Sequence, residues 1–341
     1  MTALGASSAP EGTTSRASAA SLQRVQAPVR ERLDEVTGEM WSAVATDAPL
    51  VSQMSAHLMA MRGKMFRPTL VLLSSAVEDR PDASAVTLAA AVELIHLATL
   101  VHDDAIDHSV LRRGMPTLNS LFSHQISVIM GDFLYSSALT RLVSAGNLDA
   151  LRALTRASTE MTIGELRQLA VTSPMTFSEQ DYFALIRSKT ASLISAACEI
   201  GTLCGAREHR ETMSRFGEQL GMAFQITDDL IDYTEAATTT GKPTGIDLRE
   251  HKMTLPLIAA LRTMSEGERT RVEALFAAKT PDDAAIAEVI GIVTARGGLD
   301  YARDAASGHA AEAAKTLEAL PDTVARAALF ESISYVMERH A

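Results

Sequence analysis

The stretch from residue 83 to residue 107, ASAVTLAAAVELIHLATLVHDDAID, decides the fold of this chain. Apolar residues occupy most of its helical faces, and the polar residues Glu93 and His96 only interrupt the run before its acidic end. A helix that is apolar on most faces is buried at the centre of a bundle, because little of its surface can be left to water. The stretch therefore predicts a long central helix that ends in aspartates.

The rest of the chain repeats the helical pattern. From about residue 20 apolar residues recur at three- and four-residue spacing, as in residues 22–45, and no strand-like alternation is bounded by hairpin turns. Thr176 and Glu179 have the spacing of a capping box at the start of a helix. We expect one all-α domain of about ten to thirteen helices over residues 21–341, after a Ser/Ala/Thr-rich tail over residues 1–20 that is disordered. A transit peptide is the alternative for the tail.

Composition excludes several classes of protein. The 341 residues are 47% hydrophobic and only 4% aromatic, which supports a large core and disfavours a β-sandwich or barrel. The formal net charge of −11 argues against nucleic acid as a partner. Cys198 and Cys204 are too few for a disulfide framework and are expected to be buried. No uninterrupted apolar run reaches the roughly 20 residues that span a bilayer, so we expect a soluble, cytoplasmic protein.

Two aspartate triplets with the same D-D-x-x-D spacing carry the strongest chemical signal. Each ends an apolar helical stretch: Asp103, Asp104 and Asp107 in one, Asp228, Asp229 and Asp232 in the other. Residues three and four apart share a helix face, so each triplet directs at least two carboxylates to one side. Hard oxygen ligands select Mg²⁺, which is usually completed by substrate phosphate. One triplet alone is compatible with a solvated helix end, but two predict a diphosphate clamped through metal ions.

Basic residues accompany both triplets. Arg112 and Arg113 follow the first one, and arginine forks match phosphate oxygens. Lys189, which precedes Thr190 in an apolar helix, needs an anionic partner. Lys242 and Lys252 follow the second triplet.

A second anion pocket is suggested upstream. Lys64 and Arg67 lie one helical turn apart, and His96 lies seven residues before Asp103, on much the same helix face. A core histidine that bonds to a neighbour is the alternative for His96.

Taken together, these motifs resemble the trans-polyprenyl diphosphate synthase family over about residues 25–341. The resemblance rests on motifs that occur in the family's order: GK-x-x-RP at 63–68, ELIH-x-ATLVHDDAID at 93–107, LRRG at 111–114, GDFL at 131–134, GEL-x-QL at 164–169, KTA at 189–191, FQ-x-x-DD-x-x-D at 224–232, and GK-x-x-G-x-DL at 241–248 with Lys252. Arg62, Met65 and His251 depart from the family pattern.

The resemblance implies a helical bundle around a deep central cavity. It also implies that isopentenyl diphosphate condenses head-to-tail onto an allylic primer, farnesyl or geranyl diphosphate, with about three Mg²⁺ ions, or Mn²⁺, per site. Asp103, Asp107 and Asp228 would be the main metal ligands, supported by Asp104, Asp229 and Asp232. The allylic diphosphate would be held by Arg112, Lys189, Lys242 and Lys252, and isopentenyl diphosphate by Lys64, Arg67, His96 and Arg113. Thr190 and Gln225 would lie beside the allylic cation.

Product length is read from the residues one turn before the first triplet. Ala98 and Thr99 are small, whereas short-chain members of the family carry aromatics there, so we expect a product of six to ten isoprene units. A farnesyl or geranylgeranyl product is the alternative, and close helix packing is an alternative reason for two small residues. The family also implies a homodimer, for which residues 125–143 could supply an interface, and release of the product near a membrane.

Two other functions compete with this one. A class I terpene cyclase also ionises a prenyl diphosphate, but it should lack the second triplet and contain more aromatic residues to stabilise its cations. A non-catalytic subunit of a heteromeric synthase usually loses aspartates or arginines, and this chain keeps them.

Overall fold

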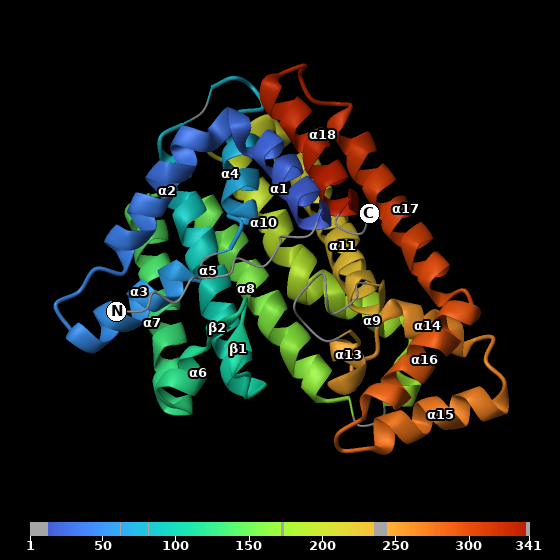
Figure 1. Ribbon diagram of the computed structural model, residues 1–341. Coiled ribbons are helices and arrows are strands. Elements are labelled where there is room, and N and C mark those ends of the chain that lie inside the picture. Colours follow the sequence, from blue (N-terminus) through green and yellow to red (C-terminus); the bar gives the residue numbers. More distant parts are fainter. Residues whose placement is uncertain (1–12, 62, 81, 172–173, 235–243, 339–341) are drawn as a thin grey trace, which may run out of the picture.

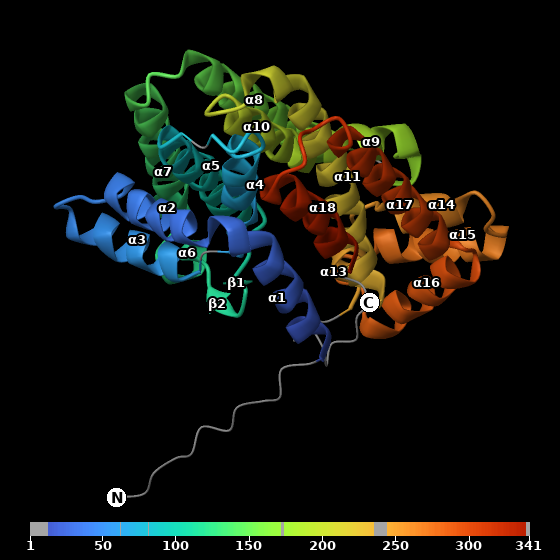
Figure 2. The same cartoon turned by 90° about the horizontal axis from the view of Figure 1, so that it is seen from above.

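The computed structural model describes residues 13–61, 63–80, 82–171, 174–234 and 244–338, with side chains from residue 20 onward. These residues form a helical bundle in which long helices run side by side (Figures 1 and 2). Thirteen of their seventeen α-helices have ten or more residues. The all-α prediction is therefore confirmed, with additional helices of only four to eight residues.

The first half of the bundle surrounds the central helix α5. Its elements are α1 (Thr13–Gln26), η1 (Ala27–Val29), α2 (Arg30–Ala43), α3 (Pro49–Ala60), α4 (Phe66–Ser75), α5 (Ser84–Ile106), β1 (Leu111–Arg112), β2 (Met115–Pro116), α6 (Leu118–Leu121), α7 (His124–Ser144) and α8 (Leu148–Leu169). Helix α5 packs against α2, α4, α7 and α10, and its apolar side chains are almost all buried. The prediction of a central helix from the stretch 83–107 is thus correct to within one residue at each end.

The second half is built on α11, which packs against α10 and α17. Its elements are η2 (Pro174–Thr176), α9 (Glu179–Ile186), η3 (Arg187–Ala191), α10 (Ser192–Thr202), η4 (Arg207–His209), α11 (Arg210–Thr234), α13 (Ile246–Arg249), α14 (Leu255–Leu261), α15 (Glu266–Ala277), α16 (Asp283–Ala295), α17 (Gly298–Leu317) and α18 (Val324–Met337). The bundle has two hydrophobic cores: one around α4, α5 and α10, the other between α9, the end of α11 and helices α14 to α17. Cys198 and Cys204 are buried, as predicted.

Three local expectations were wrong. Helix α1 begins at Thr13, so part of the expected disordered tail is helical; the chain there is rich in alanine, and α1 docks on α18. Ser178 and Asp181, rather than Thr176 and Glu179, form the capping box of α9. Residues 111–116 form a small β-hairpin, because Arg113 and Gly114 both have positive φ at the centre of a two-residue turn.

Two of the described helices, α5 and α7, are long and apolar enough to cross a bilayer by length and composition alone. The core helix of a soluble protein passes the same test, and in the most apolar window of α5 67% of the residues are buried inside the protein. In α7 the buried share is 33%, so this helix leaves an apolar surface uncovered.

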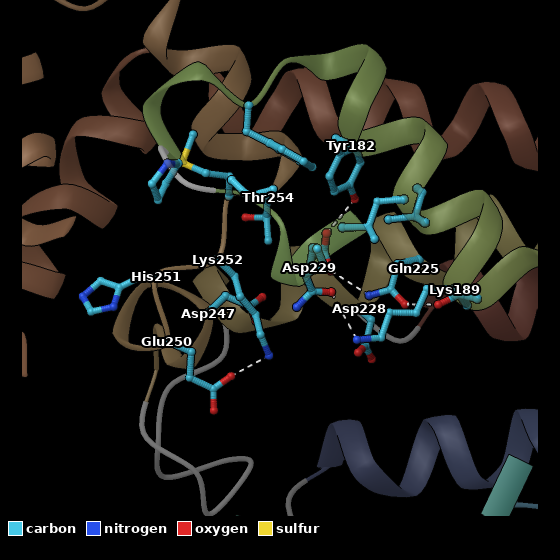
Figure 3. Close-up of a pocket in the computed structure, with 18 of the residues that line it drawn as sticks. Tyr182, Lys189, Gln225, Asp228, Asp229, Asp247, Glu250, His251, Lys252 and Thr254 are labelled. Carbon is cyan, nitrogen blue, oxygen red and sulfur yellow. Dashed lines mark hydrogen bonds and ion pairs between the residues drawn. The ribbon is translucent and has the colours of Figure 1, made fainter. Parts of the chain in front are cut away.

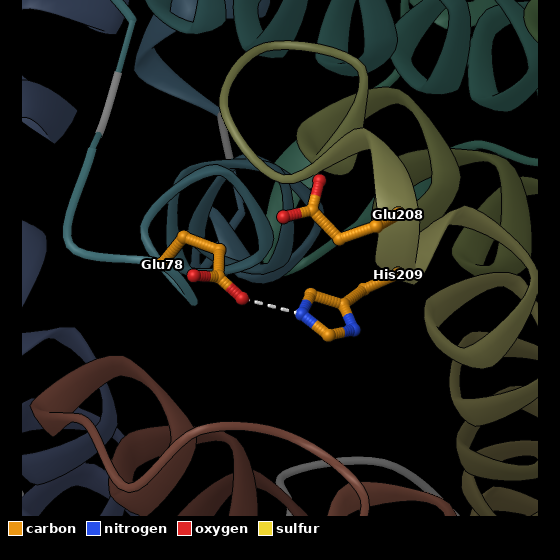
Figure 4. A group of neighbouring side chains, drawn as sticks. All are labelled: Glu78, Glu208 and His209. Atoms are coloured by element: carbon orange, nitrogen blue, oxygen red, sulfur yellow. Dashed lines mark hydrogen bonds and ion pairs between the residues drawn. The ribbon is translucent and has the colours of Figure 1, made fainter.

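The α4–α5 connection meets the start of α11 at one end of the bundle. There the His209 ring lies 2.6 Å from a carboxylate oxygen of Glu78, with Glu208 beside them (Figure 4). The Asp82 amide also donates to the Cys204 carbonyl oxygen at 3.1 Å. These contacts tie the helix connections together at the end where α5 and α11 begin, whereas both aspartate triplets lie where these helices end.

Candidate active site

A cavity of about 640 Å³ opens where α5 and α11 end (Figure 3). Its wall comes from α8, α9, η3, α11, α13 and residues 250–254, and Asp107 joins it from the end of α5. Asp228 and Asp229 line the same cavity. Members of both aspartate triplets, which are 125 positions apart in the sequence, therefore line one cavity.

The first triplet divides into two exposed or half-buried members and one buried member. Asp103 and Asp107 lie one turn apart at the end of α5, and neither carboxylate has a hydrogen-bond partner among the described residues. Asp104 is buried, and both its oxygens accept from Nε of Arg112 at 2.9 Å. Burial raises the pKa of Asp103 to about 6, although the Lys189 ammonium opposes that rise. A cation bound here would relieve the cost of ionising Asp103.

The second triplet is arranged differently. Asp228 is exposed to the cavity, whereas Asp229 is buried. Asp232 accepts the backbone N–H groups of Ile246 and Asp247, each at 2.9 Å, and so anchors the start of α13. Burial raises the pKa of Asp229 to about 7 and also raises that of Asp232.

Two residues that the sequence analysis did not single out complete this acidic wall. The Tyr182 hydroxyl donates to Asp229 at 2.5 Å, and burial raises the pKa of Tyr182 well above its ordinary value. Asp247 also lines the cavity, and burial followed by repulsion from Asp229 and Asp232 raises its pKa. Asp247 stands in the G-x-DL motif, so its position was visible in the sequence, but nothing in the sequence pairs Tyr182 with an aspartate.

Lys189 brings a positive charge to the same cavity. It lies in η3, a short π-helical turn of the kind that often marks functional sites. Its ammonium contacts Glu165 at 2.5 Å and Gln168 at 3.1 Å. The adjacent Thr190 hydroxyl donates to the Gln225 side-chain oxygen at 2.7 Å, which links η3 to α11.

The close approach of these two elements depends on Gly221. A Cβ atom there would lie 2.6 Å from the Cα atom of Ala191, so any larger residue would push α11 away from η3. Predicted residues Lys189, Thr190 and Gln225 are therefore brought together by backbone packing that only glycine permits.

Lys252 supplies a second cation from beyond α13. Its ammonium contacts Glu250 at 2.6 Å. Burial lowers the pKa of Lys252, but Glu250, Asp247 and Asp107 outweigh burial, so the net shift is upward. Because Asp107 belongs to the first triplet, the attraction between Lys252 and Asp107 links the residues after the second triplet to the first triplet. Lys242, the other lysine predicted here, lies outside the described residues.

Three of the four residues predicted for the second anion pocket interact with one another. Arg67 and Arg113 act electrostatically on the buried carboxylate of Glu93 and on the His96 ring. Burial, followed by repulsion from Arg67 and Arg113, lowers the pKa of His96 well below its ordinary value. Nε of Arg67 and Oε2 of Glu93 are buried without a hydrogen-bond partner in the described part of the chain. The Lys64 ammonium lies 5.6 Å from the centre of the Tyr335 ring.

Gly63 makes room for Arg113 in this pocket. A Cβ atom at position 63 would lie 2.7 Å from both terminal nitrogens of Arg113, one of which donates to the Met61 carbonyl oxygen at 2.9 Å. Of the positions that depart from the family pattern, Met65 and His251 both have positive φ, and Arg62 lies outside the described residues.

Ala98 and Thr99 are not among the residues that line the 640 Å³ cavity. Ala98 is buried in the core, and the partly buried Thr99 donates its hydroxyl to the His96 carbonyl oxygen at 2.8 Å. Their effect on product length stays a prediction.

The donor set suits a hard divalent cation. Carboxylate oxygens are the ligands that Mg²⁺ prefers, and several of these carboxylates carry raised pKa values that a cation would reverse. Among the described residues, no three of the six aspartates bring ligand atoms within 4.8 Å of one another. The aspartates therefore do not form a compact ligand cluster by themselves.

An all-α bundle with two acidic triplets and facing lysines defines a diphosphate-handling enzyme of the isoprenoid type. Residues 48–293 match the polyprenyl synthetase family, and the chain belongs to that family of prenyltransferases.

Individual relatives resemble the chain over most of its length. It is 37% identical to nonaprenyl diphosphate synthase of Mycobacterium tuberculosis, over 85% of this chain and 87% of that one. It is similar to the crystal structure of decaprenyl diphosphate synthase from Rhodobacter capsulatus, with a TM-score of 0.89 and 35% identity over 94% and 99% of the two chains. A polyprenyl synthase of Caulobacter crescentus, complexed with calcium and isoprenyl diphosphate, gives a TM-score of 0.88 at 32% identity over 94% and 98%.

Proposed function

We propose that this prenyltransferase condenses isopentenyl diphosphate head-to-tail onto an allylic diphosphate and so makes an all-trans polyprenyl diphosphate of six to ten isoprene units. The observation that carries the proposal is the convergence of Asp107, Asp228, Lys189 and Lys252 on one cavity beside a separate arginine-lined pocket. Two anion sites side by side are what a reaction between two diphosphates requires. The structure of a relative with calcium and isoprenyl diphosphate supports a divalent cation in this role.

The cavity would bind the allylic substrate by its diphosphate. Asp103, Asp107 and Asp228 would hold about three Mg²⁺ ions, which when bound stabilise the negative charge that grows as the allylic C–O bond breaks. Lys189, Lys252 and Arg112 would contact the diphosphate oxygens directly, together with Lys242. Lys189 would exchange Glu165, its carboxylate partner in this structure, for the substrate diphosphate.

The second pocket would hold isopentenyl diphosphate. Lys64, Arg67 and Arg113 provide positive charge. Nε of Arg67, which has no hydrogen-bond partner among the described residues, would donate to the diphosphate. His96 is neutral because its pKa is lowered, so it contributes one N–H donor and no charge.

Carbon–carbon bond formation then needs orientation more than a strong base. Holding the isopentenyl double bond near the allylic carbon gives the advantage of an intramolecular reaction. The Thr190 hydroxyl and the Gln225 amide offer dipoles beside the cation and no strong nucleophile. The leaving diphosphate takes the final proton.

A long product is supported by the small residues Ala98 and Thr99 and by the resemblance to nonaprenyl and decaprenyl diphosphate synthases. A farnesyl or geranylgeranyl product is the alternative. Assay of the purified protein alone with Mg²⁺, labelled isopentenyl diphosphate and either geranyl or farnesyl diphosphate, followed by chromatography of the products, tests both points. Chains of six to ten units support the proposal. A cyclic hydrocarbon, or activity only after a second subunit is added, would refute it.

We further propose that the protein is a cytoplasmic homodimer and that α7 forms the interface between the two subunits. The outward face of this helix carries Val128, Ile129 and Val143, and Asp132 is its one exposed formal charge among the described residues. Such a face is costly to leave in water and suits close packing against a second copy. Release of the product close to a membrane would follow from its apolar tail.

A further inference from the structure

Tyr182 occupies an unusual place in the wall of the cavity. It lies on α9 and is only 2% exposed, within the core formed by Ile186, Ile226 and Leu230. Its ring packs edge-on against Phe183 with 5.6 Å between ring centres. The side chain is therefore held firmly, and its hydroxyl is the one polar atom that it brings to the site (Figure 3).

That hydroxyl completes the hydrogen bonding of Asp229. It donates to Oδ2 at 2.5 Å, while the Gln225 side-chain amide donates to Oδ1 at 2.8 Å. Gln225 is itself fixed by the Thr190 hydroxyl at 2.7 Å. A chain of hydrogen bonds thus runs from η3 through α11 to α9, and both carboxylate oxygens of Asp229 are occupied.

We propose that Tyr182 is a positioning residue for the second aspartate triplet, because its hydroxyl holds the Asp229 carboxylate in one orientation. Asp229 then stabilises a bound metal ion as a fixed negative charge. The neighbouring Asp228 binds the metal ion directly. The proposal rests on the metal-dependent function proposed above. It follows from geometry, because Asp228 is exposed to the cavity whereas Asp229 is buried and has a donor on each oxygen.

Removing the hydroxyl leaves a buried oxygen of Asp229 without a donor. The carboxylate would then be free to turn and to compete with Asp228 for the cation, which misplaces the metal relative to the diphosphate. Groups that orient metal ligands typically change metal affinity or activity by about 10- to 100-fold when they are lost. We expect that range for Tyr182→Phe.

Tyr233 provides a matched control. It is also a buried tyrosine, one turn beyond Asp229 on α11, but its hydroxyl lies 3.0 Å from the Thr254 hydroxyl and, among the described residues, forms no hydrogen bond to an aspartate of the triplet. Tyr233→Phe therefore removes the same atom from a similarly buried setting without touching the metal-binding carboxylates.

The test measures Mn²⁺ binding by the loss of the free-ion electron paramagnetic resonance signal, with inorganic pyrophosphate present, for the full-length wild type, Tyr182→Phe and Tyr233→Phe. Thermal melting without metal controls for damage to the fold. We expect Mn²⁺ affinity to fall by about 10- to 100-fold in Tyr182→Phe alone, with both variants melting alike. Equal Mn²⁺ affinity in the two variants overturns the proposal.

Steady-state kinetics add a second readout. Tyr182→Phe should need more Mg²⁺ for half-maximal rate, and its KM for isopentenyl diphosphate should match that of Tyr233→Phe, because the arginine pocket is untouched. A rise in that KM would point to general damage and also overturns the proposal. If the wild type elongates no substrate, the proposed function fails, while the Mn²⁺ comparison still decides the role of Tyr182.

Discussion

Replacement of Gly63 by alanine tests how the second anion pocket is built. The new Cβ would lie 2.7 Å from both terminal nitrogens of Arg113, closer than nonbonded atoms approach, so the guanidinium must move. Because it is the far end of a flexible side chain, it can move without disturbing the backbone. The fold should therefore survive, and the loss should fall on whatever Arg113 binds.

The size of the effect follows from the contact that Arg113 gives up. A hydrogen bond to a charged group contributes about 1.5–3 kcal/mol, which corresponds to about a 10- to 150-fold rise in KM for isopentenyl diphosphate. The bond to the Met61 carbonyl oxygen is also lost, which costs stability about 1 kcal/mol. The KM for the allylic substrate should stay unchanged, since Arg113 is not part of the aspartate cavity.

Initial rates at varied isopentenyl diphosphate, with allylic substrate saturating, measure this KM. Gly267→Ala is the matched control, because a Cβ atom at that position on α15 meets nothing within 4 Å. A KM in Gly63→Ala equal to that of Gly267→Ala would show that Arg113 does not hold isopentenyl diphosphate. A rise in the allylic KM instead would show that the two pockets have been assigned the wrong way round.

Three further outcomes are expected. The pKa values of Asp103 and Asp229 in the folded protein, about 6 and about 7, lie above the ordinary 3.8, so the folded chain binds these protons more tightly than the unfolded chain. Thermal melting of the metal-free protein should therefore show stability rising as the pH is lowered from about 8 to about 5. Saturating Mg²⁺ should make stability less dependent on pH. Stability that falls over this range would contradict the conclusion that burial makes these two carboxylates costly to ionise. Thr99→Phe should shorten the product in chromatographic analysis, because a ring one turn below Asp103 would block the growing chain; an unchanged product distribution means that the chain runs elsewhere. Ile129→Glu, at a side chain that is 65% exposed, should convert a dimer to a monomer in sedimentation, and a variant that stays dimeric moves the interface away from α7.

The sequence predicted the long-range arrangement of this site because the signals are periodic. A central helix and two acidic triplets are visible from helical spacing alone, and the motif order then implies that they meet. An anionic partner for Lys189 was also predictable, since a charge in an apolar helix needs one.

The sequence could not predict the different surroundings of the individual aspartates. Asp104 and Asp107 belong to the same triplet, yet Asp104 is buried against Arg112 and Asp107 lines the cavity. The difference depends on where the 111–116 hairpin returns, and that hairpin rests on two positive φ angles, one of them at an arginine. The Tyr182 contact has no sequence signal because it joins two helices 47 positions apart.

The most direct test of the central claim is a crystal structure with Mn²⁺ and a thio analogue of the allylic diphosphate that does not ionise, in which anomalous scattering locates the metal. The account predicts manganese on both sides of a single diphosphate, bound by Asp103 and Asp107 on one side and by Asp228 on the other. Manganese at one triplet only, or a diphosphate bound outside the cavity between α5 and α11, would contradict it.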